Sequence, residues 1–263
     1  MIRIGLCTEV ANAAVVADTG IDFIEENIQR LLVPRQNAAT FAPMLAAAKA
    51  SPLPIIAANA FLPGDLKCVG PNVDSDALMH YGAVAFARAQ QVGIRTMVIG
   101  SGASRQIPDG WSVSAADEQF TDLLTQYAPL AETHGITIVV EALNRGECNY
   151  INSLAEGAAI VAAVAHPAVQ LLTDIYHMLR EDEPATAITT HAAVIRHAHI
   201  AERAERTAPG IAGDDVSAYF SALAHMRYRG AIAIEARMGS DLNGETARAV
   251  QTIRAAWDAA QRP

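Results

Sequence analysis

The chain contains 263 residues, of which 51% are hydrophobic and 18% are charged, and its formal net charge is −9. Such a chain can bury a large core, which excludes a disordered protein, and its length fits one large α/β barrel or two modest domains. The net negative charge repels phosphate backbones, so binding to nucleic acid would require a local basic patch. We expect no nucleic-acid partner.

Eight short apolar runs follow one another along the chain and predict eight strands. They cover residues 3–8, 22–26, 53–60, 96–100, 137–141, 169–174, 195–201 and 231–236. The runs lack polar alternation, which is typical of parallel strands buried on both faces. Four glycines precede such runs and would end the preceding helices in the left-handed conformation. They are Gly20, Gly93, Gly135 and Gly230.

Amphipathic patterns between these runs predict helices. One apolar face contains Phe120, Leu123, Leu124, Tyr127 and Leu130, a second contains Val216, Tyr219, Phe220 and Leu223, and a third contains Val250, Ile253 and Trp257. Ser153 and Glu156 have the spacing of a capping box, which predicts the start of a helix that ends before Pro167.

Eight β/α units in about 250 residues predict a (β/α)8 barrel, which we expect to form a single domain over residues 1–263. An open, doubly wound sheet is the rival architecture. It normally has a glycine-rich turn after its first strand, whereas residues 8–12 have the sequence Thr-Glu-Val-Ala-Asn. The barrel is therefore the preferred fold.

The cysteines and the apolar segments indicate a soluble, cytoplasmic protein without a membrane partner. Cys7, Cys68 and Cys148 are widely spaced and include no Cys-x-x-Cys pair, which favours reduced thiols over a disulfide framework or a zinc ribbon. The first apolar run is short and Glu9 follows it, so it does not resemble a signal peptide. The longest uncharged stretch, residues 157–173, is shorter than the roughly 20 residues that span a bilayer.

Polar side chains stand at or near the ends of four consecutive predicted strands. They are Glu141, Asp174, His199 and Glu235, each about one β/α unit from the next. Because the carboxyl ends of barrel strands face one point, we expect these side chains to converge. Three carboxylates and one imidazole suit Mn²⁺, Mg²⁺, Co²⁺ or Zn²⁺. Without a cation the three acids would repel one another.

Further polar side chains follow these strand ends and suit a ligand rich in hydroxyl groups. They are Asn144, Arg145, Glu147, Tyr176, His177, Glu202, Arg203 and Arg206. His197 shares the parity of His199 and is expected to lie one layer deeper, as a structural residue. The other histidines fall in or at the ends of predicted helices, where surface or capping roles are expected. Residues 100–102 with Arg105 could hold an anion, although a simple turn explains the glycines as well.

These stretches resemble signatures of the xylose-isomerase-like barrel superfamily of sugar isomerases and epimerases. Residues 141–147 match E-x-L-N-R-x-E, residues 174–178 match D-x-x-H-M, residues 199–210 resemble an H-x-x-E…R…PG loop, and residues 61–67 and 98–102 are also similar to stretches of that family. Glu235 matches the final metal-binding glutamate. The pattern is most similar to the ketose 3-epimerases of the tagatose and psicose type.

The resemblance implies a role for each matching residue. One divalent metal, with Mn²⁺ preferred, would be held by Glu141, Asp174, His199 and Glu235. Glu141 and Glu235 would also exchange protons with the substrate, while Glu147, His177 and Arg206 would contact the sugar. The segment from His199 to Arg206 is one residue longer than the family pattern, which leaves Arg203 as a competing candidate. Family members are often dimers or tetramers, so we expect a homo-oligomer.

Such a site would act through an enediolate, formed when a carboxylate removes a proton beside a ketone. Return of a proton to the opposite face gives epimerisation, and 3-epimerisation of a ketose is the preferred function. Return to the adjacent carbon gives an isomerase of the hydroxypyruvate or inosose type, and loss of a β-hydroxyl gives a dehydratase. A nuclease for abasic DNA is a weaker alternative, because the third and fourth predicted strands supply no further histidine. A non-enzymatic barrel is also weaker, because all four candidate ligands are present.

Overall fold

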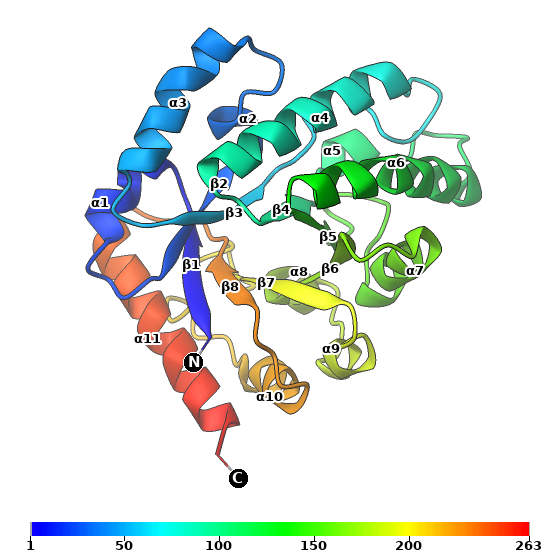
Figure 1. The fold of residues 1–263 in the computed structure, drawn as a ribbon. Coiled ribbons are helices and arrows are strands. Elements are labelled where there is room, and N and C mark those ends of the chain that lie inside the picture. The colour runs from blue at the N-terminus through cyan, green and yellow to red at the C-terminus, as the bar shows by residue number, and fades with distance from the viewer. Residues whose placement is uncertain (1, 263) are drawn as a thin grey trace.

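The computed structural model describes residues 2–262 and shows a closed barrel of eight parallel strands with helices around it (Figure 1). The strands are β1 (Arg3–Cys7), β2 (Phe23–Asn27), β3 (Ile55–Asn59), β4 (Thr96–Ile99), β5 (Thr137–Glu141), β6 (Val169–Asp174), β7 (Ile195–Ile200) and β8 (Ala231–Ile234). Neighbours in sequence are neighbours in the sheet, and β1 pairs with β8 to close the barrel. The predicted (β/α)8 barrel is confirmed, and the open sheet is excluded.

Helices occupy the connections and form the outer ring in Figure 1. They are η1 (Val10–Asn12), α1 (Ala13–Val16), α2 (Ile28–Leu31), α3 (Ala38–Ala50), α4 (Ser75–Val92), α5 (Gly102–Arg105), α6 (Val113–Thr133), α7 (Leu154–Val164), α8 (Ile175–Arg180), α9 (Thr186–Thr190), α10 (Ser217–His225) and α11 (Leu242–Ala260). The three predicted apolar faces fall on α6, on and just before α10, and on α11, and all three pack against the core, with Leu130 half-buried. Burial of these faces, rather than helix propensity, stabilises the ring.

Helix ends follow the expected chemistry with two exceptions. Ser153 accepts a hydrogen bond from the backbone N–H of Glu156 and begins α7. Gly93 ends α4 with a φ of +103°, and Gly135 has a positive φ just after α6. Gly20 also has a positive φ, but it does not end α1, which is followed by Ala17 in the right-handed conformation. The prediction for Gly230 is wrong, because Arg227 is the left-handed residue after α10.

The core has two layers. The larger one lies between strands and helices, and a smaller one fills the barrel interior. Inside, the ring of Phe23 occupies space that is free only because Gly5 has no side chain: a Cβ there would lie 2.3 Å from the ring. Phe23 and Glu25 share a face of β2, so the residues beyond this apolar plug are polar and point into the same interior.

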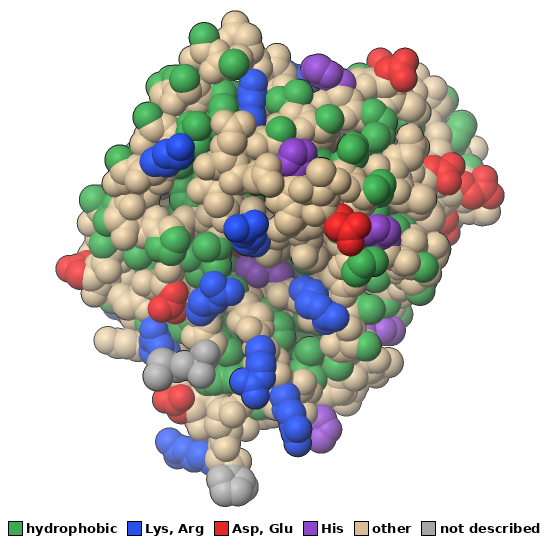
Figure 2. Space-filling model, in the orientation of Figure 1, with side chains coloured by type: hydrophobic (Ala, Val, Ile, Leu, Met, Phe, Trp, Pro, Cys, Tyr) green, Lys and Arg blue, Asp and Glu red, His purple; other side chains and the backbone are tan. Residues whose placement is uncertain are grey.

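The outer surface is mixed. On the face shown in Figure 2, hydrophobic side chains are scattered among polar atoms, while Lys and Arg side chains gather around and below the centre. The net charge of −9 therefore does not describe every face of the molecule. Within residues 2–262, no helix is both long and apolar enough to cross a bilayer.

Candidate active site

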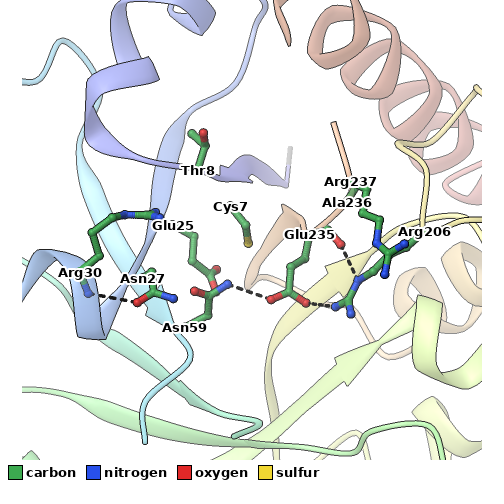
Figure 3. A pocket seen from close by; sticks show the side chains of 10 residues that line it. All are labelled: Cys7, Thr8, Glu25, Asn27, Arg30, Asn59, Arg206, Glu235, Ala236 and Arg237. Carbon is green, nitrogen blue, oxygen red and sulfur yellow. Dashed lines mark hydrogen bonds and ion pairs between the residues drawn. The ribbon is translucent and has the colours of Figure 1, made fainter. Parts of the chain in front are cut away.

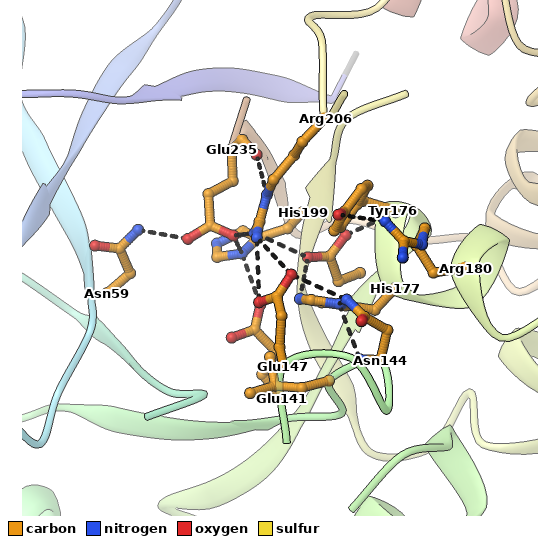
Figure 4. Close-up of polar contacts among 12 residues, drawn as sticks. Asn59, Glu141, Asn144, Glu147, Tyr176, His177, Arg180, His199, Arg206 and Glu235 are labelled. Atoms are coloured by element: carbon orange, nitrogen blue, oxygen red, sulfur yellow. Dashed lines mark hydrogen bonds and ion pairs between the residues drawn. The ribbon is translucent and has the colours of Figure 1, made fainter. Parts of the chain in front are cut away.

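The four predicted side chains from the ends of β5 to β8 converge. Figure 4 labels three of them, Glu141, His199 and Glu235. One potential ligand atom each from Glu141, Asp174, His199 and Glu235 lies within 4.8 Å of the others. Nδ1 of His199 is 3.0 Å from Oε1 of Glu141 and 3.4 Å from Oε2 of Glu235. Oδ1 of Asp174 accepts the backbone N–H of Tyr176, whereas its buried Oδ2 has no hydrogen-bond partner among the described residues.

Burial and mutual repulsion perturb these acids. Burial raises the pKa of Asp174 to about 8, and the charge of Glu141 adds to the effect. Burial and the charge of Glu235 raise the pKa of Glu141 as well. Burial also acts on Glu235, but His199 and Arg206 outweigh it and lower the pKa of Glu235 to about 2.

This donor set fits a divalent cation. It offers three hard carboxylates and one imidazole, and the orphaned oxygen of Asp174 faces the same point. A positive ion would relieve the repulsion that raises the pKa values of Asp174 and Glu141. The cluster could therefore hold a metal.

Glu25, on β2, bridges two histidines of β7. Its Oε1 lies 2.8 Å from Nε2 of His199, and its Oε2 lies 2.7 Å from Nε2 of His197. When Nε2–H of His199 donates to Glu25, the Nδ1 lone pair faces the acid cluster, which is how carboxylates orient metal-binding histidines. Both histidines lower the pKa of Glu25 far enough to outweigh its burial.

Glu25 is not among the site residues predicted from the sequence. The available signal was the pair Glu25 and Glu26 at the end of an apolar run. An isolated strand-end acid has many roles, and only the contact across the barrel with β7 separates Glu25 from Glu26. His197 lies deeper than His199, as expected, and is buried.

Glu141 occupies space that Gly100 leaves open. A Cβ on Gly100 would lie 1.9 Å from Oε2 of Glu141. The buried guanidinium of Arg105 donates to the carbonyl oxygens of Glu141 and Ile99, at 2.7 and 3.1 Å. Because Arg105 is committed to backbone carbonyls, the structure favours the simple turn over an anion site at residues 100–102.

Arg206 is the arginine that reaches the cluster. Its guanidinium pairs with Glu235, lies 3.3 Å from Oε1 of Glu147 and stacks over the ring of Tyr176 at 4.5 Å. Arg203 instead pairs with Asp182 at the surface, at 2.8 Å. The tertiary structure thus separates the two arginines that the sequence left open.

The loop that carries Arg206 is organised by Glu202. Its carboxylate accepts backbone N–H groups from Gly210 and Gly213, at 2.8 and 2.9 Å, and the hydroxyl of Thr207 at 2.9 Å. Arg206 itself has a φ of +55°, which is uncommon for a residue with a Cβ. The buried carboxylate holds the loop in the shape that directs Arg206 inward.

His177 presents a single donor to the site. The backbone N–H of Asn144 donates to Nδ1 of His177 at 3.0 Å, so Nε2 carries the proton of the neutral ring. Burial and the nearby charge of Arg206 lower the pKa of His177 to about 3, which keeps the ring neutral. Its Nε2 is buried and has no hydrogen-bond partner among residues 2–262, although Oδ2 of Asp174 is 3.5 Å away.

Two cavities meet at Arg206 and Glu235. One, of about 310 Å³, is also lined by Glu141, Glu147 and His177. The other, of about 360 Å³, opens beside the ends of β1, β2, β3 and β8 (Figure 3). At their junction, Nδ2 of Asn59 donates to Oε1 of Glu235 at 2.8 Å. Asn59 was not identified as a site residue from the sequence.

Comparison with known proteins places this barrel. The model of a family described as xylose isomerase-like TIM barrel matches residues 13–256. The chain belongs to this family. The solved structure of a D-psicose 3-epimerase with D-tagatose, from Clostridium cellulolyticum H10, aligns with this xylose isomerase-like barrel at a TM-score of 0.83 and 20% identity, over 97% of this chain and 99% of that one. At that identity the likeness shows the fold.

Two curated relatives of this xylose isomerase-like barrel are epimerases. A D-psicose 3-epimerase of Ruminiclostridium cellulolyticum is 33% identical over 125 residues, which are 46% of this chain and 42% of that protein. A 3-dehydro-D-guloside 4-epimerase of Escherichia coli is 29% identical over 131 residues, 49% of this chain and 50% of that protein. The matched regions span half or less of either relative.

Proposed function

We propose that this protein is a divalent-metal-dependent sugar isomerase or epimerase, and that it catalyses the 3-epimerisation of a ketose. The observation that carries the proposal is the convergence of Glu141, Asp174, His199 and Glu235 from four consecutive strands. The names of the relatives, which include a D-psicose 3-epimerase, support a ketose as the substrate class.

The same four residues would hold the metal, with Mn²⁺ as our first choice and Mg²⁺, Co²⁺ or Zn²⁺ as alternatives. A divalent ion would act as a Lewis acid on neighbouring substrate oxygens and thereby acidify the C–H bond beside the ketone. Glu25 would keep the His199 ring in its binding orientation through the 2.8 Å contact with Nε2.

Glu141 and Glu235 are the proposed acid–base pair. In Figure 4 Glu141, from β5, approaches the cluster from below, and Glu235, just after β8, approaches it from above. One carboxylate takes the proton from C3, and the C–H electron pair moves into the enediolate. The other carboxyl group holds a proton before the step and donates it to C3 on the opposite face, the electron pair re-forms the C–H bond, and the ketone is restored with inverted configuration. Exchange with solvent then returns both carboxyl groups to their starting protonation states.

Three further residues would position the sugar. His177 would donate its Nε2–H to a substrate oxygen, which would satisfy a buried atom that has no hydrogen-bond partner among residues 2–262. Arg206 remains charged, because Glu235, Asp174 and Glu147 raise its pKa despite its burial. Its guanidinium donates to hydroxyl or carbonyl oxygens, while the half-exposed Glu147 accepts from hydroxyl groups.

The test is hydrogen exchange into a panel of ketoses in D₂O, followed by NMR, with Mn²⁺ or with a chelator. We expect deuterium at C3 together with the C3 epimer, only when Mn²⁺ is present. Deuterium with an aldose product would favour an isomerase of the hydroxypyruvate or inosose type, and loss of a hydroxyl would favour a dehydratase. An absence of exchange by protein shown to contain Mn²⁺ would contradict 3-epimerisation of these sugars.

A further inference from the structure

The larger cavity beside Glu235 contains more positive charge than the proposed reaction uses (Figure 3). Three arginines line it: Arg30, Arg206 and Arg237. In Figure 3 Arg30 lies across the cavity from the other two, and Glu25 and Glu235 lie between them. What the cavity can bind depends on which of these charges already has a partner inside the protein.

Most charged groups in the cavity have partners. Oε1 of Glu26 accepts from Arg30, and Glu235 pairs with Arg206. Glu25 is held between two histidines, so neither acid of the cavity wall is left to neutralise a further cation. Arg237 is the exception, because its side chain has no hydrogen-bond or ion-pair partner among residues 2–262. The backbone N–H of Arg237 donates to the carbonyl oxygen of Arg206 at 2.8 Å, which holds the backbone of Arg237 beside the site.

Two other side chains of the wall have hydrogen-bond donors without a partner among residues 2–262, while Oδ1 of Asn59 is an acceptor without one. Oγ1 of Thr8 accepts from Nδ2 of Asn12 at 2.9 Å, which leaves its hydroxyl proton free to donate. Oδ1 of Asn27 accepts the backbone N–H of Arg30 at 3.1 Å, which leaves the amide hydrogens of Asn27 free. A cavity wall with a spare cation and spare donors complements an anion.

We propose that the substrate carries an anionic group, a phosphate or a carboxylate, and that Arg237 binds this group in the cavity beside Glu235. The inference rests on the proposed function, since it extends the substrate of the same site. Arg237 lies two residues beyond Glu235 in the chain, which corresponds to about 7 Å of extended backbone. That distance is comparable to the length of a short sugar carbon chain, so one end could react while the other is bound.

The test compares ketoses in three matched forms: neutral, with a terminal phosphate, and with a terminal carboxylate. With Mn²⁺ present, we expect kcat/KM for C3–H exchange to be at least about tenfold higher for one anionic form than for the neutral sugar. The better of the two anionic forms identifies the group.

Arg237→Met tests the residue, and Arg229→Met is its control. Both residues are exposed arginines that flank β8, one after and one before the strand, and both variants lose one positive charge. Arg237→Met should lower the anionic-to-neutral ratio by about 10- to 100-fold, the range for one charge-assisted contact, and Arg229→Met should leave it unchanged. Arg237→Lys should retain part of the ratio.

Binding of inorganic phosphate, measured by calorimetry on the Mn²⁺-loaded protein, separates this inference from the proposed function. If no ketose exchanges but phosphate binds the parent protein and Arg229→Met more tightly than Arg237→Met, the anion site stands and the epimerase proposal fails. If neutral and anionic ketoses exchange equally well, the anion site is overturned and the proposed function stands. Equal phosphate affinity of the parent protein, Arg229→Met and Arg237→Met would also overturn the anion site.

Discussion

The two halves of the barrel contribute to the centre in different ways. Strands β5 to β8 end in the clustered side chains, and their loops carry Glu147, His177 and Arg206. Strands β1 to β4 supply none of the four clustered residues, but each of three supporting positions acts on one of them. Glu25 contacts His199, Asn59 contacts Glu235, and Gly100 leaves room for Glu141.

Under the proposed function, β5 to β8 would carry the reactive groups and the residues of β1 to β4 would orient them. Orientation matters because misplacement of a catalytic group by about 1 Å can lower a rate about 100-fold. We therefore expect graded effects on the reaction rate. Loss of a proposed reactive group should lower the rate most. Loss of an orienting contact should lower it less and should change either metal affinity or the position of one side chain.

The largest effect is expected for the acid–base pair. Glu141→Gln and Glu235→Gln should each lower metal-dependent epimerisation at C3 about 1,000-fold, because inversion needs both carboxyl groups and an amide cannot exchange the substrate proton. Formation of the C3 epimer at saturating Mn²⁺ separates loss of proton transfer from weakened metal binding. A variant that retains more than a tenth of the parent rate would remove that residue from the pair.

Gly100→Ala should have the largest effect among changes in the supporting half. Its Cβ would displace the Glu141 carboxylate, and we expect exchange to fall about 100-fold. Gly110→Ala is the control: nothing lies within 4 Å of its Cβ, but its φ is +78°. It should lose about 1 kcal/mol of stability in denaturant unfolding and keep its activity. Equal activity of both variants would show that Glu141 tolerates displacement.

Metal affinity should depend steeply on pH. The pKa of Asp174 is raised to about 8, so this carboxyl holds a proton at pH 7 without a cation and must release it to bind one. Affinity for Mn²⁺ should therefore rise about tenfold per pH unit from pH 6 to pH 8 and then level off. The raised pKa also means that the metal-free fold loses stability as pH rises from about 4 through 8. Calorimetry in buffers of different ionisation enthalpy checks the proton release, and a flat affinity would contradict it.

Glu25→Gln should weaken Mn²⁺ binding about 10- to 100-fold, since the His199 ring would lose the carboxylate that orients it. Glu26→Gln is a matched control in the adjacent position. Glu26 is equally buried but accepts the backbone N–H of Val10 at 2.7 Å and pairs with Arg30, away from the cluster. Its variant should lose stability without a change in metal affinity, and similar affinities for the two variants would contradict the orienting role of Glu25.

The smallest effect is expected for Asn59→Ala. It removes one neutral donor from Oε1 of Glu235, and a contact of this kind corresponds to about a fivefold change in rate. We expect kcat to fall with little change in Mn²⁺ affinity, because Glu235 keeps its contact with Arg206. A parallel fall in metal affinity would instead assign Asn59 to the metal centre.

The barrel and the convergence of the four clustered side chains could be predicted from the sequence. Each of the eight apolar runs overlaps an observed strand, and only β2 extends beyond its run, by Asn27, because burial on both faces leaves a continuous hydrophobic signal in the sequence. Glu141, Asp174 and His199 could be located because position at a strand end predicts convergence in a closed barrel. The helix end at Gly230 failed because Arg227 takes the left-handed conformation first.

The contacts that residues of β1 to β4 make with the cluster became apparent only in the tertiary structure. Glu25 lies more than 170 positions from the histidines it bridges, and nothing in its local sequence distinguishes it from Glu26. Likewise, Arg203 and Arg206 share one loop, and the fold of that loop around Glu202 selects the arginine that points inward. Contacts between distant strands have no local pattern, because they exist only after the barrel closes.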